Sequence, residues 1–296
     1  MPARILDGKA IAAEFLGALR ERSGAVAAKL GRRPHLVAVI VGDDPASRIY
    51  VRNKERACEK ADVQSTLLTL PASTTETDLV ERIETLNEDA EVDGILVQLP
   101  LPKGIREQTI LRTVSPDKDV DCFHPLNVGL LAEGAPVFLP CTPAAVLEIL
   151  RRSNVPLQGA HVVVVGRSNV VGKPLSLLLI QKDVGATVTV CHTQTKDLSA
   201  EVKRGDVVVA AAGRAGLIRG DMLKTGAVVI DVGTNRGDDG KLVGDVEFGP
   251  ASEVASAITP VPGGVGPMTC ALVVRNTIEA AARQFVVKGA SGSATR

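Results

Sequence analysis

A tyrosine and a lysine stand four residues apart in the first half of the chain, at Tyr50 and Lys54. This spacing places both side chains on one face of a helix. A lysine acts as a base near neutral pH only where burial or a neighbouring cation disfavours its ammonium form. A tyrosine one turn away can stack on a flat substrate. The pair is therefore a candidate catalytic site, although a solvated helix face gives the same spacing.

Two further polar residues occur where a ligand cleft is expected. Gln98 interrupts the apolar run that starts at Gly94, and an amide without partners in such a strand costs about 1–3 kcal/mol. Asp121 lies in a polar segment before His124, and a carboxylate there can accept paired N–H donors from a planar heterocycle. We therefore add Gln98 and Asp121 to the candidate catalytic and substrate-binding residues.

A strand, a glycine turn and a helix start are predicted from Val162 to Pro174. Such a turn directs backbone N–H groups and the helix dipole toward a phosphate. Its two glycines, Gly166 and Gly172, are six residues apart, so the spacing differs from the usual dinucleotide fingerprint. The segment predicts a dinucleotide site, with a purely structural turn as the alternative.

The residues around this turn favour NADP over NAD. The second strand ends at Cys191 and continues into His192 and Thr193, without the acidic residue that holds the ribose hydroxyls in NAD sites. Arg167 can meet a 2′-phosphate with its planar fork, and Thr193 offers a neutral hydroxyl. We expect Gly166, Arg167 and Thr193 to contact the cofactor.

Alternating strand and helix signals must position these residues. The first half predicts β-strands and helices in turn, with strands at 36–41, 67–70 and 94–99 and helices at 9–30, 44–61 and 75–90. The second half predicts a helix at 143–153, strands at 162–165, 187–191, 207–210, 228–232 and 257–259, a hairpin or turn within 236–247, and a helix at 267–287.

The predicted fold class is α/β, with two α/β domains and a cleft between them. The C-terminal domain is expected to be a Rossmann-like, doubly wound parallel sheet. Prolines and polar turns between 113 and 142 indicate the boundary, so the expected domains are 1–122 and 123–286, followed by a disordered tail at 287–296. The last helix is expected to pack back on the first domain.

The bulk composition excludes several classes of function. Lysine plus arginine and aspartate plus glutamate number 34 each, and tryptophan is absent, so neither charge nor aromatic stacking indicates nucleic acid. No apolar run reaches the ~20 residues of a membrane span, and no secretory segment is recognisable. The five cysteines lack zinc or redox spacing. We expect a cytoplasmic protein with no metal, no nucleic acid and no membrane.

Taken together, these segments resemble the bifunctional methylenetetrahydrofolate dehydrogenase/methenyltetrahydrofolate cyclohydrolase family, over about residues 4–286. The matching motifs are, in order, Asp7-Gly8-Lys9, Tyr50 to Lys54, Gly94 to Pro102, Asp117 to Pro125, Gly166 to Pro174, Asp231 to Asn235 and Pro260 to Thr269. The last of these motifs is highly specific in combination with the others.

The resemblance implies NADP-dependent oxidation of 5,10-methylenetetrahydrofolate to the methenyl cation, followed by hydrolysis to 10-formyltetrahydrofolate in one-carbon metabolism. Lys54 is then the catalytic lysine, Tyr50 stacks on the folate, Gln98 lies beside Lys54, and Asp121 binds the pterin. The N-terminal domain would bind folate and the C-terminal domain NADP. A homodimer through the dinucleotide domains is also implied.

The resemblance assigns further ligand contacts. Cofactor contacts are implied at Gly166, Arg167, Ser168, Thr193 and Thr234. The loop implied to line the folate side of the cleft contains Pro262, Gly263, Gly264 and Val265.

Two positions depart from the family pattern. Cys122 stands where glycine is usual, and a Cβ there can narrow the pterin pocket or shift Asp121. Thr234 stands where an aliphatic residue is usual. Two alternatives stay open: a monofunctional dehydrogenase that has lost hydrolysis, and a folate- or nucleotide-binding protein without turnover. A quinate/shikimate-type oxidoreductase does not account for residues 260–269.

Overall fold

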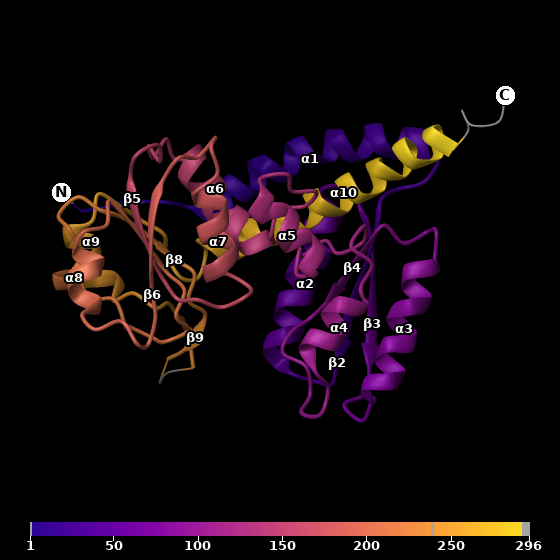
Figure 1. Cartoon of the computed structure of the whole chain (residues 1–296), viewed down its shortest axis with the longest axis horizontal. Helices are drawn as coiled ribbons and strands as arrows, with labels where there is room; N and C mark the ends of the chain where they lie inside the picture. Colours follow the sequence, from indigo (N-terminus) through magenta and orange to yellow (C-terminus); the bar gives the residue numbers. More distant parts are fainter. Residues whose placement is uncertain (1, 238–239, 292–296) are drawn as a thin grey trace. The chain divides into compact units, whose positions relative to one another are not determined.

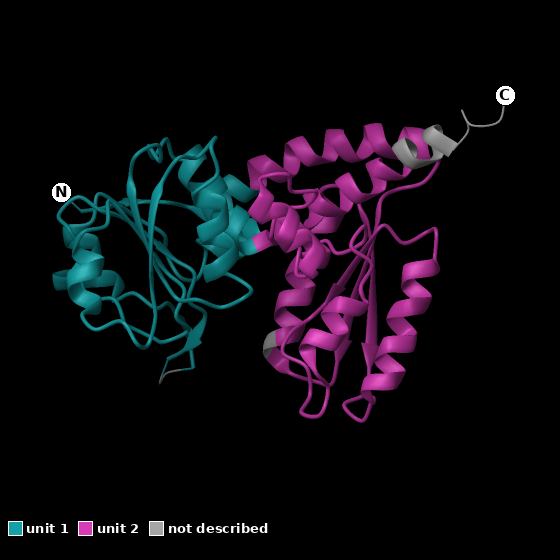
Figure 2. Cartoon of the chain, in the orientation of Figure 1, with its two compact units in different colours: residues 1–12, 142–269 teal, residues 13–141, 270–296 magenta. Residues whose placement is uncertain are grey.

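The computed structural model describes residues 2–237 and 240–291, and the chain forms two compact units (Figure 2). Unit 1 consists of Met1–Ala12 with Thr142–Thr269, and unit 2 of Ala13–Cys141 with Cys270–Arg296. Each unit is thus built from two separate pieces of the chain.

This division differs from the expected domains 1–122 and 123–286. The N-terminal residues join unit 1 because strand β1 (Arg4–Ile5) pairs with strand β11 (Ala257–Ile258). Residues from Cys270 onward join unit 2, where the Asn276 amide donates to the carbonyls of Val120 and Leu139, at 2.7 and 2.8 Å. The packing of the last helix onto the first half of the chain was expected; the strand contributed by the N-terminus was not.

Unit 2 is a three-stranded parallel sheet with helices. Its elements are α1 (Gly8–Leu30, which begins in unit 1), β2 (His35–Val41), α2 (Pro45–Lys60), β3 (Gln64–Leu70), α3 (Glu76–Glu88), β4 (Gly94–Val97), α4 (Glu107–Thr113), α5 (Pro125–Glu133) and α10 (Val265–Ser291, which also begins in unit 1). The sheet order is β3-β2-β4, and all pairs are parallel. The chain therefore reverses its direction of progress through the sheet at β2, so a crevice is expected at the carboxyl ends of β2 and β4.

The core of unit 2 follows from the apolar strands. Alternate residues of β2, including Val37 and Val39, pack with β4 against α3 and α4, whose Leu79, Ile83 and Ile110 are fully buried. Helices α4 and α5 were not predicted, because a few turns in a proline-rich stretch give too little periodicity to recognise.

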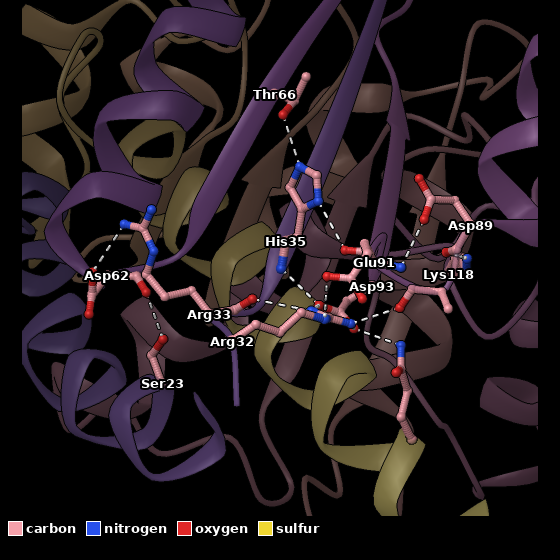
Figure 3. A network of polar contacts seen from close by, with 12 residues as sticks. Ser23, Arg32, Arg33, His35, Asp62, Thr66, Asp89, Glu91, Asp93 and Lys118 are labelled. Atoms are coloured by element: carbon pink, nitrogen blue, oxygen red, sulfur yellow. Dashed lines mark hydrogen bonds and ion pairs between the residues drawn. The ribbon is translucent and has the colours of Figure 1, made fainter. Parts of the chain in front are cut away.

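The buried carboxylate of Asp93 binds residues at the amino-terminal ends of the strands of this sheet (Figure 3). It accepts both terminal nitrogens of Arg32, at 2.6 and 3.0 Å, the backbone N–H of His35 at 2.8 Å and the side-chain amide of Gln284 at 2.7 Å. Removing one partner of such a buried pair costs about 3–5 kcal/mol. This network therefore ties the start of β2, the start of β4 and helix α10 into one unit, away from the carboxyl ends of the strands.

Unit 1 contains a six-stranded parallel sheet. Its other elements are α6 (Cys141–Arg152, which begins in unit 2), β5 (His161–Val165), α7 (Gly172–Leu179), β6 (Thr187–Cys191), α8 (Leu198–Lys203), β7 (Val207–Ala210), η1 (Gly220–Met222), β8 (Val228–Asp231), β9 (Asn235–Arg236), β10 (Leu242–Val243) and α9 (Phe248–Val254). The sheet order is β1-β11-β8-β7-β5-β6. Helices α6 and α7 lie on one side of it, and α8 and α9 on the other (Figure 1).

The predicted Rossmann-like arrangement of the second half is confirmed. Strand β5 lies between β6 and β7, so the chain reverses its direction of progress through the sheet at β5. In open parallel sheets ligands bind outside the carboxyl ends of the strands at this reversal. The predicted glycine turn at Gly166 directly follows β5 and therefore lies at that position.

Two smaller predictions fall in the same half. The hairpin predicted within 236–247 is present, since β9 and β10 pair antiparallel; Asp238 and Asp239 lie outside the described residues. Helix α10 extends to Ser291, beyond the predicted end at 287; of the expected tail at 287–296, residues 292–296 lie outside the described residues. Among the described helices, none has the length and apolar character needed to cross a membrane.

Candidate active site

Helix α2 carries the predicted Tyr50–Lys54 pair, and its start is fixed locally. The Asp44 carboxylate accepts the backbone N–H and the hydroxyl of Ser47, both at 2.7 Å, and Pro45 occupies the first turn. Both residues were predicted as the helix start, because a capping aspartate followed by proline satisfies the first free N–H groups. The helix leaves the carboxyl end of β2, so Tyr50 and Lys54 follow the point where unit 2 is expected to bind a ligand.

Lys54 and Gln98 are in direct contact. The lysine is 9 % exposed, and its Nζ donates to Gln98 Oε1 at 3.1 Å. Gln98 follows β4, its backbone N–H donates to Val39 O at 2.8 Å, and its Nε2 donates to Leu99 O at 2.7 Å. The side-chain amide is therefore oriented with its oxygen toward the lysine, because its nitrogen is already engaged.

Asp121 lies in a turn shaped by another aspartate, Asp119. The buried Asp119 carboxylate accepts the backbone N–H groups of Phe123 at 3.1 Å and His124 at 2.8 Å, and the side-chain amide of Asn127 at 2.9 Å. Burial raises the pKa of Asp119 above its ordinary value. Asp121 is half-buried in this turn. Because Asp119 holds the backbone of the turn, it also fixes the backbone position from which the Asp121 side chain extends.

The charges of Lys54 and Asp121 act on the same buried thiols. Burial raises the pKa of Cys270, the charge of Lys54 lowers it, and the charge of Asp121 raises it. Cys141, whose pKa is raised mainly by burial, experiences both charges as well. The predicted lysine and aspartate are thus within electrostatic range of common neighbours in unit 2, with Tyr50 half-buried one turn before the lysine.

Cys122 has a backbone conformation that favours glycine. Its φ is +61°, in the left-handed region, which costs a residue with a Cβ about 1–2 kcal/mol. Its side chain is buried, and the thiol donates to Phe138 O at 3.4 Å. The Cβ therefore points away from solvent into packing between the turn and Phe138, and the turn that carries Asp121 is retained.

In unit 1 the predicted cofactor turn is closed tightly. Gly166 has a φ of +133°, and a Cβ on it would collide with the carbonyl of Ala211, the first residue after β7. Only glycine permits both the backbone angle and this close approach. Ser168 Oγ accepts the backbone N–H of Val171 at 3.1 Å, which shapes the start of α7.

The other predicted cofactor residues lie at the same edge of the sheet. Arg167 and Ser168 are exposed in the turn after β5, Thr193 is exposed after β6, and Thr234 is exposed after β8. Because the strands are parallel, these four residues follow the carboxyl ends of strands in a single sheet. Their exposure leaves their side chains accessible to a ligand.

The predicted folate loop, Pro262 to Val265, packs against the N-terminal Asp7-Gly8-Lys9 motif. The backbone N–H of Lys9 donates to Gly263 O at 3.1 Å, and a Cβ on Gly8 would collide with the carbonyl of Gly264. Asp7 Oδ1 accepts the N–H of Lys9 at 2.9 Å and so caps helix α1. The sequence motif thus supports the loop, a function that its spacing alone does not indicate.

Two buried aspartates near the predicted cofactor turn, Asp231 and Asp245, were not among the predicted site residues. Asp231 ends β8, its carboxylate accepts the backbone N–H groups of Gly233, Asp245 and Val246 at 2.9–3.0 Å, and burial raises its pKa to about 6. Asp245 is fully buried. Aspartates that end or follow an apolar run in sequence are a usable signal, but their distant backbone partners are not visible in it.

Comparison with known proteins identifies the family to which both halves of the chain are similar. Residues 6–121 match the family described as "Tetrahydrofolate dehydrogenase/cyclohydrolase, catalytic domain", and residues 140–285 match its "NAD(P)-binding domain". The chain belongs to the tetrahydrofolate dehydrogenase/cyclohydrolase family. The two matched segments end at residue 121 and begin again at residue 140, whereas the compact units divide the chain differently.

Relatives in this family are similar over nearly their whole length. The "Bifunctional protein FolD" of Bordetella petrii is 55% identical over 281 residues, which are 95% of this chain and 95% of that protein. The crystal structure of bifunctional FolD from Campylobacter jejuni has a TM-score of 0.92 at 45% identity, covering 95% of this chain and 99% of that one. A Trypanosoma brucei family structure, described as complexed with NADP cofactor and inhibitor, has a TM-score of 0.91 at 40% identity, covering 96% and 99%.

The backbone of Cys122 generates a testable prediction. Alanine in place of Cys122 keeps the left-handed cost and loses the thiol contact, whereas glycine loses the same contact and removes that cost. We expect Cys122→Gly to be about 1 kcal/mol more stable than Cys122→Ala, measured as the free energy of unfolding in urea. As a control, the same pair at Ala145, fully buried in α6, should favour alanine. Equal stability of the two Cys122 variants would contradict the argument.

Proposed function

We propose that this chain oxidises 5,10-methylenetetrahydrofolate with NADP and then hydrolyses the methenyl product to 10-formyltetrahydrofolate. Membership of the family and the bifunctional relatives support this proposal. The observation on which it rests in this chain is the contact between the buried Lys54 and Gln98, because hydrolysis requires a group that can manage a proton beside the substrate.

The residues at the Gly166 turn fit a dinucleotide. The turn lies at the reversal point of a parallel sheet and begins a helix, the arrangement that places N–H groups toward a pyrophosphate. Arg167 and Ser168 are exposed beside it, and Thr193 follows the next strand without an acidic neighbour. We assign Gly166, Ser168, Thr193 and Thr234 to NADP binding and Arg167 to its 2′-phosphate.

When bound, NADP accepts the hydride from the methylene carbon of the folate. The protein supplies alignment and exclusion of water in this step, because hydride transfer needs no protein acid. We assign stacking on the folate to Tyr50 and binding of the pterin to Asp121. The loop from Pro262 to Val265 is assigned to line the folate site with its backbone.

For hydrolysis we assign the proton transfer to Lys54. Gln98 Oε1 accepts one N–H of the lysine, and a neutral amine so held keeps its lone pair for a proton of water. The water oxygen bonds to the methenyl carbon and one water proton passes to Nζ, which gives a neutral hydroxyl adduct. The carbon–N5 bond then breaks with protonation of N5, and the hydroxyl loses its remaining proton as the carbonyl of the 10-formyl product forms. Of the two water protons, one therefore ends on N5 and the other is released to solvent.

The two reactions can be tested separately in one assay. With methylenetetrahydrofolate and NADP supplied, the parent protein should form NADPH and then consume the methenyl species. Lys54→Met should lower the rate of methenyl hydrolysis by about 100-fold or more, since a positioned base contributes at least that factor. Lys60→Met, an exposed lysine in the last turn of the same helix, serves as the control and should hydrolyse at the parent rate.

Each other outcome has a distinct meaning. NADPH formation without hydrolysis by the parent protein supports a monofunctional dehydrogenase. Absence of NADPH supports a folate- or nucleotide-binding protein without turnover. Hydrolysis by Lys54→Met at the parent rate contradicts the assignment of Lys54 alone.

Arg167 is expected to determine the choice of cofactor. Its guanidinium can bind a 2′-phosphate through two parallel charge-assisted hydrogen bonds, and NAD lacks that group. Arg167→Ala should raise the KM for NADP by about tenfold or more, corresponding to roughly 1.4 kcal/mol of lost binding, and leave the KM for NAD nearly unchanged. NAD is thus the internal control, and an equal effect on both cofactors would contradict this role.

We also propose a homodimer through unit 1, in a cytoplasmic protein whose five cysteines are free and buried. Strand β6 ends the six-stranded sheet, and its Val190 is 37% exposed; Ile180, at the end of the α7 helix that packs on β6, is 56% exposed. An open edge strand with apolar neighbours is suited to pairing with a second copy around a twofold axis.

Light scattering after size-exclusion chromatography should give twice the chain mass of 30.9 kDa. Val190→Lys places a charge on the pairing edge and should weaken the dimer about tenfold or more. Leu67→Lys, an exposed position in the end strand β3 of the other sheet, is the matched control and should stay dimeric. A monomeric parent protein, or dissociation by Leu67→Lys alone, would contradict an interface at β6.

A further inference from the structure

The carboxylate of Asp245 is fully buried and accepts four N–H donors from two separate segments, the loop after β7 and the start of β9. Oδ2 accepts the backbone N–H groups of Ala212 and Gly213, at 2.6 and 2.9 Å. Oδ1 accepts the backbone N–H of Arg214 at 2.9 Å and the side-chain amide of Asn235 at 2.8 Å. Three consecutive backbone donors therefore converge on one side chain from a segment more than thirty residues away.

The first of these loops supports the cofactor turn directly. Ala211 continues from β7, and its N–H donates to Val165 O, at the end of β5, at 2.8 Å. Its carbonyl occupies the space that a Cβ on Gly166 would need. A displacement of the loop from Ala211 to Arg214 is therefore transmitted to the Gly166 turn, because the two backbones are in contact.

The second loop carries Thr234. Asn235, its neighbour, is bound to Asp245, while the N–H of Gly233 is bound to Asp231 at 2.9 Å. The same Asp231 oxygen accepts the backbone N–H of Asp245 at 2.9 Å. The two carboxylates thus hold the residues on both sides of Thr234 and fix their own positions relative to each other.

We propose that Asp245 is a positioning residue for NADP, which fixes the loops after β7 and β8 and through them the Gly166 turn and Thr234. The proposal rests on the placement of the cofactor at that turn. The Asp245 side chain is fully buried and accepts backbone N–H groups, so it acts through the backbone of these segments. An asparagine in its place directs its NH2 group toward at least one of the three backbone N–H donors, so that donor loses its acceptor and must move.

The test compares Asp245→Asn with the parent protein in three measurements. Isothermal titration calorimetry should give a dissociation constant for NADP raised by about tenfold or more, since small displacements of aligned groups cost such factors. The KM for NADP should rise in parallel. Hydrolysis of supplied methenyltetrahydrofolate without cofactor should stay within twofold of the parent rate. If Asp245→Asn does not fold, the milder Asn235→Ala, which removes one donor, should show the same pattern to a smaller degree.

Asp206→Asn is the matched control in the same sheet. Asp206 accepts the backbone N–H of His161 at 2.9 Å and Lys224 Nζ at 2.6 Å, at the amino ends of β5 and β7. Its substitution weakens an aspartate's contacts at the opposite ends of the strands and should leave NADP binding within twofold. If NADP binding is unchanged in Asp245→Asn, or if hydrolysis falls by the same factor as NADP binding, the proposal is wrong.

Arg167→Ala separates the proposal from the cofactor placement on which it rests. Weaker NADP binding in Arg167→Ala with unchanged binding in Asp245→Asn overturns the positioning role alone. Unchanged binding in both variants overturns the placement of the cofactor as well.

Discussion

In the segments that follow the carboxyl ends of the parallel strands, backbone N–H groups lie beyond the hydrogen bonds of the sheet. Aspartate side chains accept hydrogen bonds from these groups in both units. Asp44 holds the start of α2, Asp119 holds the turn around Asp121, and Asp231 and Asp245 hold the loops after β7 and β8. Buried backbone donors without partners are costly, so these carboxylates allow irregular chain to persist at the sheet edge. In unit 2, Tyr50 and Lys54 lie on helix α2, whose start Asp44 caps. Gln98 directly follows β4, and Asp121 lies in the turn that Asp119 holds.

The two units differ in the side chains that they present at the carboxyl ends of their strands. Unit 2 presents a buried amine held by an oriented amide, which suits proton transfer. Unit 1 presents a glycine turn and exposed polar side chains, which suit a phosphate-bearing cofactor. The same type of sheet therefore serves two different chemical purposes, since the loops and not the strands determine the chemistry.

The repeating elements could be predicted from sequence because they depend on local patterns, and the candidate site residues were chosen from signals of the same local kind. The apolar strand before Gly166, the capped helix with Lys54 and the polar interruption at Gln98 all have signals within a few residues. Strand β1, only two residues long, has no such signal, and it places the first residues of the chain in the six-stranded sheet of unit 1. Asp245 could not be predicted as a hub, because its partners lie ten to thirty-three residues away and are mostly backbone groups that every residue possesses.

The interleaved composition of the units has a consequence for synthesis on the ribosome. Unit 2 needs Asn276 and Gln284 to bind the segment at Val120 and the carboxylate of Asp93, and unit 1 needs the first residues of the chain to meet β11. Neither core is complete when the first 141 residues have emerged. Such long sequence separation slows folding, so the nascent N-terminal half must wait, with the α10 side of its core uncovered, until nearly the whole chain has been translated.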